Sequence, residues 1–196
     1  MGLVSTILTV GHSRHSIQRF IALLDSAQVT AIVDVRSAPA SRFSPQFNKK
    51  ALAASLATRN ISYEFFGKEL GGRPERAELY TQGVADYEKM AAAAEFRAGM
   101  GRLVKLAKQH RVAVMCAEAH PLDCHRCLLV GRALAEWGRE VGHLMPSGEI
   151  ITQAQAEDRL LDLAGLVEAD LLRPRVERLA EAYRARNRKA GYTRSP

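Results

Sequence analysis

Short apolar runs with the length of buried strands recur along the chain, and segments with helical spacing separate them. The runs cover residues 7–10, 31–35, 62–66, 112–115 and 140–145. Ser16 stands where its hydroxyl can cap the helix that follows the first run. Strands that alternate with helices predict an α/β fold, a single three-layer domain in which helices flank a mainly parallel sheet of about five strands.

The longest helical patterns lie between the third and fourth runs and after the last one. Residues 84–109 predict a helix interrupted near Gly99 and Gly101, and residues 124–137 predict another helix. We expect residues 1–150 to form the α/β domain and residues 151–196 to form a basic helical C-terminal extension. The apolar stripe of this extension is predicted to consist of Leu172, Val176, Leu179 and Tyr183.

The composition is typical of a soluble globular protein. The chain has 196 residues, of which 47% are hydrophobic and 25% charged, so it can build one substantial core. No apolar run approaches the roughly 20 residues that span a bilayer, and no signal segment is visible, so we expect a cytoplasmic protein without a membrane partner. Three cysteines do not make a disulfide framework and are expected to be free thiols.

Positive charge is in excess and is concentrated in the extension. The 28 basic and 21 acidic residues leave a net charge of +7, which favours anionic partners. A solvated helical face explains the basic extension, and nucleic-acid binding is the alternative, because phosphate contacts need cations but no motif. The residues concerned are Arg173, Arg175, Arg178, Arg184, Arg186, Arg188 and Lys189.

Polar clusters follow three of the predicted strands. They are Gly11-His12-Ser13, Asp34-Val35-Arg36 and Cys116-Ala117-Glu118. The carboxyl ends of parallel strands meet at one edge of a sheet, which is where open α/β sheets bind ligands. We therefore expect these clusters to meet in one cleft.

These clusters also carry a resemblance to a known family. The chain resembles the domain of unknown function 488 family, and the resemblance covers most of residues 7–145. It implies a compact α/β domain with an enzyme-like site, but it implies no particular reaction or substrate. The motifs that carry it are Thr9-Val10-Gly11-His12-Ser13, Val33-Asp34-Val35-Arg36 with Pro39, Ser41-Arg42 and Phe47, Leu70-Gly71-Gly72-Arg73, Cys116-Ala117-Glu118 and Cys124-His125-Arg126.

Several arginines near the strand ends indicate an anion pocket. Guanidinium groups bind phosphate or carboxylate through paired donors, and a helix N-terminus adds free N–H groups. The alternative is internal pairing, of Arg36 with Asp34 or of Arg126 with Glu118. The predicted residues for binding a small anionic ligand are Ser13, Asp34, Arg36, Arg42, Arg73 and Arg126.

Four residues are candidates for catalysis. Cys116 is a candidate nucleophile, because nearby arginines and a helix N-terminus would favour its thiolate. A noncatalytic site residue and a packed core residue are the alternatives for Cys116. His12 or His125 could transfer its proton, and Glu118 could act as acid or base.

Metal and cofactor sites are less favoured by the pattern. Cys116, Cys124 and His125, with His12 or His143, offer zinc ligand types, but adjacent Cys124 and His125 at a helix start are expected to diverge. No nucleotide-cofactor motif is present, and a Cys-x5-Arg phosphatase loop fails because Leu122 stands six residues after Cys116. We assign no metal site and no cofactor.

The sequence favours an enzyme that acts on an anionic, phosphate-bearing substrate, related to nucleotides or nucleic acid, in a cleft at the strand ends. A noncatalytic module that binds nucleic acid or another anion is the first alternative. A zinc-binding protein is the second.

Overall fold

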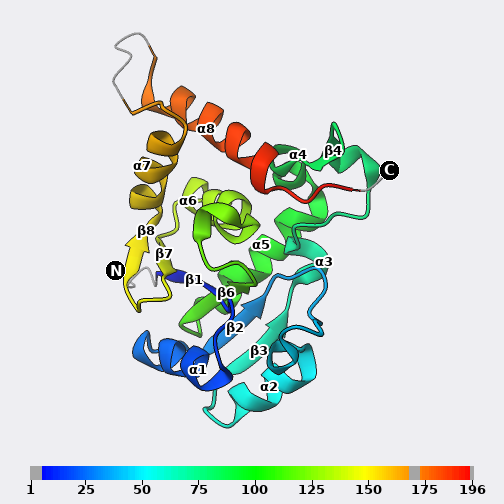
Figure 1. Ribbon diagram of the computed structural model, residues 1–196, viewed down its shortest axis with the longest axis vertical. Helices are drawn as coiled ribbons and strands as arrows, with labels where there is room; N and C mark the ends of the chain where they lie inside the picture. The colour runs from blue at the N-terminus through cyan, green and yellow to red at the C-terminus, as the bar shows by residue number, and fades with distance from the viewer. Residues whose placement is uncertain (1–5, 168–172, 195–196) are drawn as a thin grey trace.

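The computed structural model describes residues 6–167 and 173–194, and this part of the chain contains a six-stranded sheet in the order β3-β2-β6-β1-β7-β8 (Figure 1). The first five strands in this order run parallel, and β8 pairs antiparallel with β7. The mainly parallel α/β sheet is therefore confirmed. The strands are β1 (Ile7–Gly11), β2 (Ala31–Asp34), β3 (Ser62–Phe65), β6 (Val112–Cys116), β7 (Val141–Leu144) and β8 (Ile150–Thr152).

The sixth strand was not predicted. In β8 only the middle residue, Ile151, is buried, and three residues are too short for a visible alternation. The predicted boundary between residues 150 and 151 falls inside this strand, so the extension begins within the sheet.

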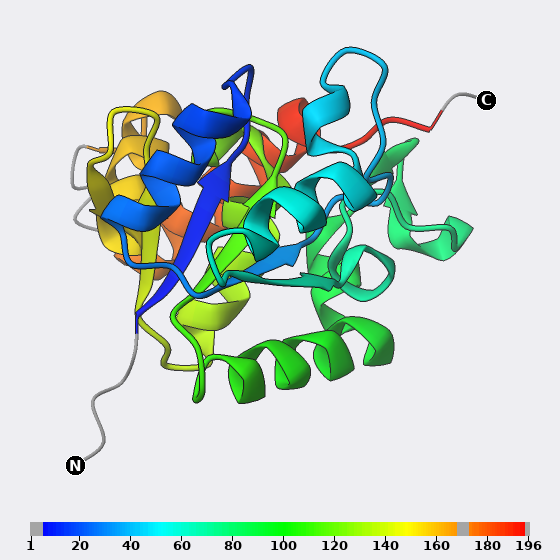
Figure 2. The same ribbon diagram turned by 90° about the horizontal axis from the view of Figure 1, so that it is seen from below.

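Helices cover both faces of the sheet, as the three-layer prediction requires (Figures 1 and 2). Alternate side chains of β2 enter the two layers, with Ile32 packed on one side and Val33 on the other. The first face carries α1 (Ile17–Ser26) and α2 (Lys49–Ala57). The second face carries α5 (Ala94–Leu106), the π-helix η4 (Arg126–Gly131), α6 (Arg132–Glu136) and α7 (Gln153–Leu163).

The segment predicted as one helix over residues 84–109 has a different structure. It begins with the second strand of a hairpin, β4 (Tyr80–Thr81) and β5 (Val84–Ala85), and continues as α4 (Tyr87–Ala92) and α5. The break lies at Ala93, whose backbone is extended, and Gly99 and Gly101 both lie inside α5. Gly99 instead allows α3 (Gly67–Leu70) to approach, because a Cβ there would lie 2.6 Å from Glu69 Cβ.

The junction after β6 also differs from a simple helix start. Three short 3₁₀ turns occur in the described chain, η1 (Pro45–Phe47), η2 (Ala77–Leu79) and η3 (Pro121–Asp123), and η3 follows β6. Cys124 then has an extended backbone, with φ −143° and ψ 141°, and His125 is the first residue with helical angles. The predicted helix over residues 124–137 is thus a π-helix followed by α6.

The extension packs against the rest of the domain. In α8 (Arg175–Ala190), Tyr183 is buried, and the Asn187 side chain accepts from the Tyr87 N–H and donates to the Ala85 carbonyl. The predicted apolar stripe is wrong at Val176, which is 72% exposed, and Leu172 lies outside the described residues. None of the described helices is long and apolar enough to cross a membrane.

Candidate functional site

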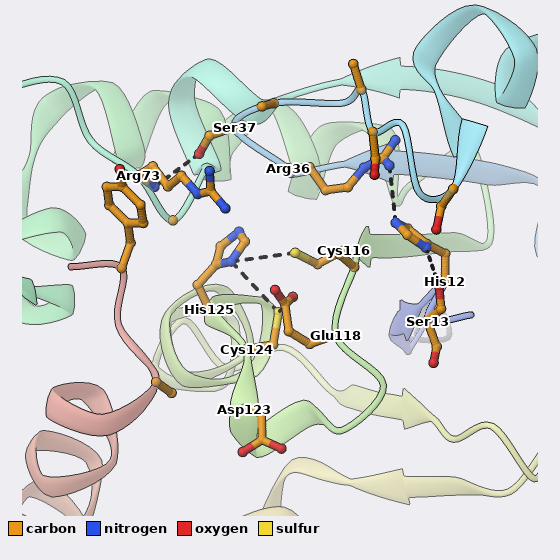
Figure 3. Close-up of a pocket in the computed structure, with 18 of the residues that line it drawn as sticks. His12, Ser13, Arg36, Ser37, Arg73, Cys116, Glu118, Asp123, Cys124 and His125 are labelled. Carbon is orange, nitrogen blue, oxygen red and sulfur yellow. Dashed lines mark hydrogen bonds between the residues drawn. The ribbon is translucent and has the colours of Figure 1, made fainter. Parts of the chain in front are cut away.

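A cavity of about 670 Å³ opens at the carboxyl ends of β1, β2 and β6 (Figure 3). All three predicted polar clusters contribute to its wall. Ala190 and Tyr192, which end or follow α8, form a further part of the wall. Seven of the predicted site residues line this cavity: His12, Ser13, Arg36, Arg73, Cys116, Glu118 and His125.

Two thiols and one imidazole converge in this wall. The Sγ atoms of Cys116 and Cys124 lie 3.7 and 3.8 Å from His125 Nδ1, and the three atoms lie within 4.8 Å of one another (Figure 3). His125 Nε2 lies 3.0 Å from the Val35 carbonyl, which can only accept, so this nitrogen carries a hydrogen. The contact orients Nδ1 toward the two sulfur atoms. We call Cys116, Cys124 and His125 the Cys-His cluster.

The expectation that Cys124 and His125 would diverge is wrong. It assumed that both residues belong to a helix, where neighbouring side chains point about 100° apart. Cys124 is instead extended, and only His125 has begun the helical turn. The change of backbone conformation between them brings both side chains to the same side.

The two thiols have opposite pKa shifts. A hydrogen bond to Cys124, together with burial, raises the pKa of Cys116 well above its ordinary value. Burial also opposes ionisation of Cys124, but the Cys116 hydrogen bond and the positive charges of Arg126 and His125 hold its pKa well below the ordinary value. Of the two thiols, Cys124 is therefore the one that ionises more readily, although the sequence pointed to Cys116.

Glu118 lies beside Cys124. The Cys124 thiol donates to Glu118 Oε2 at 3.0 Å, so the proton of this thiol lies between the two groups. Burial, followed by the negative charge of Cys124, raises the pKa of Glu118. Burial opposes protonation of His125, but the negative charge of Cys124 in its ionised form raises the pKa of His125.

His12 is held as a neutral ring. Its Nδ1–H donates to the Ser13 carbonyl at 2.9 Å, and its Nε2 accepts from Arg36 Nη1 at 3.2 Å. The ring stacks on Phe47 at 4.2 Å, and burial lowers the pKa of His12 to about 4. Because both nitrogens are engaged, His12 has no free position for proton transfer.

Arg36 lines the cavity, but most of its donors are used inside the protein. Its Nε and Nη2 atoms donate to the two carboxylate oxygens of Asp34 at 2.9 and 2.6 Å, and Nη2 also donates to the Phe47 carbonyl. Asp34 is fully buried, does not line the cavity, and accepts a further hydrogen bond from Tyr63. Arg36 and Asp34 thus pair with each other inside the protein, which was the alternative to ligand binding by these two residues.

Arg126 lies beneath the cavity wall and does not line it. Its Nη1 and Nη2 donate to the carbonyls of Glu118 and Ala119 at 2.6 and 3.0 Å, and its side chain is almost fully buried. A Cβ at Gly11 would lie 1.8 Å from the same Glu118 carbonyl. Arg126 and Gly11 therefore position the backbone that carries Glu118.

The cationic residues of the rim differ from those predicted. Arg73 lines the cavity and its guanidinium lies 4.8 Å from the Tyr192 ring. Arg42 is exposed, stacks on Phe43 and does not line the cavity. Arg14 lines the cavity and was not predicted, although it directly follows Gly11-His12-Ser13.

Cys124 and Tyr192 were not among the predicted site residues, for different reasons. Cys124 was weighed only as a zinc ligand, and its predicted helical backbone counted against that role. Tyr192 has no local signal, because only the packing of α8 brings it to the cavity. Long-range packing of this kind cannot be read from spacing along the chain.

One comparison with known proteins gives a result. A family model described as "Domain of unknown function DUF488" matches residues 16–133. No curated protein and no solved structure matches the chain. The matched segment includes the ends of β2 and β6 and the whole Cys-His cluster, but it leaves out β1 and α8.

Proposed function

Because this chain belongs to the DUF488 family, a domain of unknown function, we propose its function from the site itself: an enzyme that acts on a small anionic, phosphate-bearing substrate in the cleft at the carboxyl ends of the strands. One observation carries the proposal. The Cys-His cluster and Glu118 face a cavity whose wall also holds Arg14 and Arg73. Reactive groups and cations thus share one space.

The cavity suits a small charged molecule. Its volume of about 670 Å³ lies within the range of small-molecule sites. Arg14 and Arg73 have exposed side chains that can meet a phosphate, whereas Arg36 contributes charge from a fixed position against Asp34. Ser13 adds a hydroxyl to the same wall. A phosphorylated metabolite or a single nucleotide matches this size and charge.

The Cys-His cluster is the reaction centre in this proposal. Glu118 lies within proton-transfer distance of Cys124, so a carboxylate accompanies the cluster. His12 is left out of the chemistry because Ser13 and Arg36 engage both its nitrogens. Its task is to hold Arg36 in place.

A noncatalytic nucleic-acid-binding module is the weaker alternative. Such a module needs cations that are free to meet phosphates. In the extension, Arg184 pairs with Glu88, Arg186 with Asp123, and Arg175 with Asp158. These contacts favour a structural task for the basic helix.

Turnover of a substrate panel tests the proposal. The protein would be incubated with sugar phosphates, nucleoside monophosphates and phosphodiesters, and products would be followed by mass spectrometry. We expect Arg73→Ala to raise KM about tenfold with little change in kcat, because the arginine binds substrate and transition state equally. Arg139→Ala removes the same charge at the amino end of β7, far from the cleft, and serves as the control.

Two results would contradict the proposal. One is equal KM values for the Arg73 and Arg139 variants. The other is full turnover in a folded Cys124→Ala variant, which would remove the cluster from the chemistry.

A further inference from the structure

We propose that the Cys-His cluster binds a soft divalent cation, with Zn²⁺ as the best fit, through Cys116, Cys124 and His125. The inference deepens the proposed function and rests on it for the claim that the metal meets a substrate. The sequence argued against this site because Cys124 and His125 were expected to diverge. Their convergence removes that objection.

The ligand set is typical of zinc. Two thiolates and one imidazole are soft to intermediate donors, which select zinc over magnesium or calcium. Two thiolates also balance the charge of a divalent cation. Three protein ligands with an open fourth position are characteristic of catalytic rather than structural zinc.

The two sulfur–nitrogen distances fit a tetrahedral site. With Zn–S near 2.3 Å and Zn–N near 2.0–2.1 Å, a tetrahedron places sulfur and nitrogen about 3.6 Å apart. The observed separations from His125 Nδ1 are 3.7 Å to Cys116 and 3.8 Å to Cys124. One nitrogen directed equally at two sulfur atoms cannot form a good hydrogen bond to both, but it can share a metal with both.

The surroundings hold the ligands in place. The Nε2–H of His125 donates to the Val35 carbonyl, the usual support for a metal-binding imidazole. The Arg126 N–H donates to Cys124 Sγ at 3.4 Å. Gly72 packs against the ring so closely that a Cβ there would lie 2.8 Å from Nδ1.

The fourth position faces the cavity. All three ligand residues line the cavity, and Glu118 lies beside Cys124 without belonging to the group within 4.8 Å. A metal here supplies Lewis acidity to a substrate oxygen or to a bound water molecule. Glu118 stands close enough to exchange a proton with such a water molecule.

Cobalt and zinc titrations of the full chain test the site. The protein would be stripped with a chelator under reducing conditions and titrated with Co²⁺. We expect one ion per chain, a thiolate-to-cobalt charge-transfer band, the visible bands of tetrahedral cobalt, and displacement of cobalt by Zn²⁺. Cys116→Ser and Cys124→Ser should each weaken binding at least about 100-fold, beyond the loss expected when only a residue that supports a ligand is changed.

Matched variants keep the test decisive. Cys127→Ser changes the third buried thiol, which lies against His143 and Gln153 outside the cluster, and should bind cobalt like the unchanged protein. Circular dichroism would establish that each variant is folded. Glu118→Gln should keep the metal and lose turnover, whereas the ligand variants should lose both.

The outcomes separate the two proposals. Octahedral cobalt without a charge-transfer band, or equal binding by the Cys124 and Cys127 variants, overturns the metal site. Metal-independent turnover by the stripped protein overturns a catalytic task for the metal and supports the enzyme. Tetrahedral metal binding with no turnover of any panel member supports the site and counts against the proposed function.

Discussion

At the scale of single residues, buried histidines are oriented through both ring nitrogens. His125 uses the Val35 carbonyl and the cluster sulfurs, and His12 uses a carbonyl and a guanidinium. His143, in β7, accepts from Thr9 through Nδ1 and donates to Gln153 through Nε2. A ring fixed in this way has a defined tautomer, and in His12 a second proton would break the contact with Arg36.

We predict that His143 makes the protein less stable in acid. Burial lowers the pKa of His143 from 6.5 to about 4, so the unfolded chain binds more protons between these values. The stabilisation is complete above pH 6.5 and is lost as the pH falls toward 4, by about 3 kcal/mol. Urea unfolding at several pH values measures how the free energy of unfolding depends on pH. His143→Gln should reduce this dependence by the equivalent of one bound proton, and an unchanged dependence would contradict the prediction.

Residue types at the strand ends could be predicted, but their roles depended on backbone detail. Cys116, Glu118 and His125 were found because each follows or belongs to a clear strand-to-helix junction. Cys124 reaches the Cys-His cluster because its own backbone is extended shortly before the π-helix begins. No sequence pattern indicates a π-helix. Arg126 was misjudged because its guanidinium reaches backbone carbonyls instead of the cavity.

At the scale of elements, glycine has two different effects within α5. Gly99 faces α3, where a Cβ would lie 2.6 Å from Glu69 and 3.0 Å from Leu70. Gly101 is exposed, and a methyl group added there would meet no neighbouring side chain or element within 4 Å. Glycine at position 99 therefore permits a close contact between helices, whereas glycine at position 101 only lowers the stability of α5.

Substitution by alanine should separate these effects. Gly101→Ala should raise the free energy of unfolding by about 0.5–1 kcal/mol, because alanine restricts the unfolded chain. Gly99→Ala should lower it by about 1–3 kcal/mol through overpacking against α3. Denaturant unfolding of the two single variants measures both changes. Equal effects would mean that α3 and α5 can separate without cost.

The strands that could be predicted are mostly buried runs, and those that could not are short. Four of the five parallel strands are fully buried, and three of them, β1, β2 and β6, are mainly apolar over their four or five residues. β8 and the β4–β5 hairpin have strands of two or three residues and depend on partners elsewhere. The division of residues 84–109 followed from capping by Asp86 and an extended Ala93.

At the scale of the whole molecule, the extension is joined to the α/β domain by a buried polar network. Gln153 connects His143 in β7 with Tyr183 in α8, and Tyr183 donates to Glu157 in α7. Thr193 adds an isolated bridge to Val84. α8 should therefore unfold together with the sheet.

Removal of residues 167–196 tests this coupling. The shortened chain loses the buried Tyr183 and should lose at least about 3 kcal/mol, which corresponds to a fall in Tm of roughly 6–12 °C. Val176→Ser, at an exposed position of α8, should leave Tm nearly unchanged. An unaltered Tm, combined with lost affinity for nucleic acid, would favour a separate binding arm.

The position of Tyr192 in the cavity wall has a consequence for biosynthesis. Chains emerge from the ribosome amino end first, and β1, β2 and β6 are complete about eighty residues before Tyr192 is added. Newly made molecules should therefore hold an assembled Cys-His cluster beside an open side wall. Tyr192, which is added after the strands that carry the cluster, completes this part of the cavity wall.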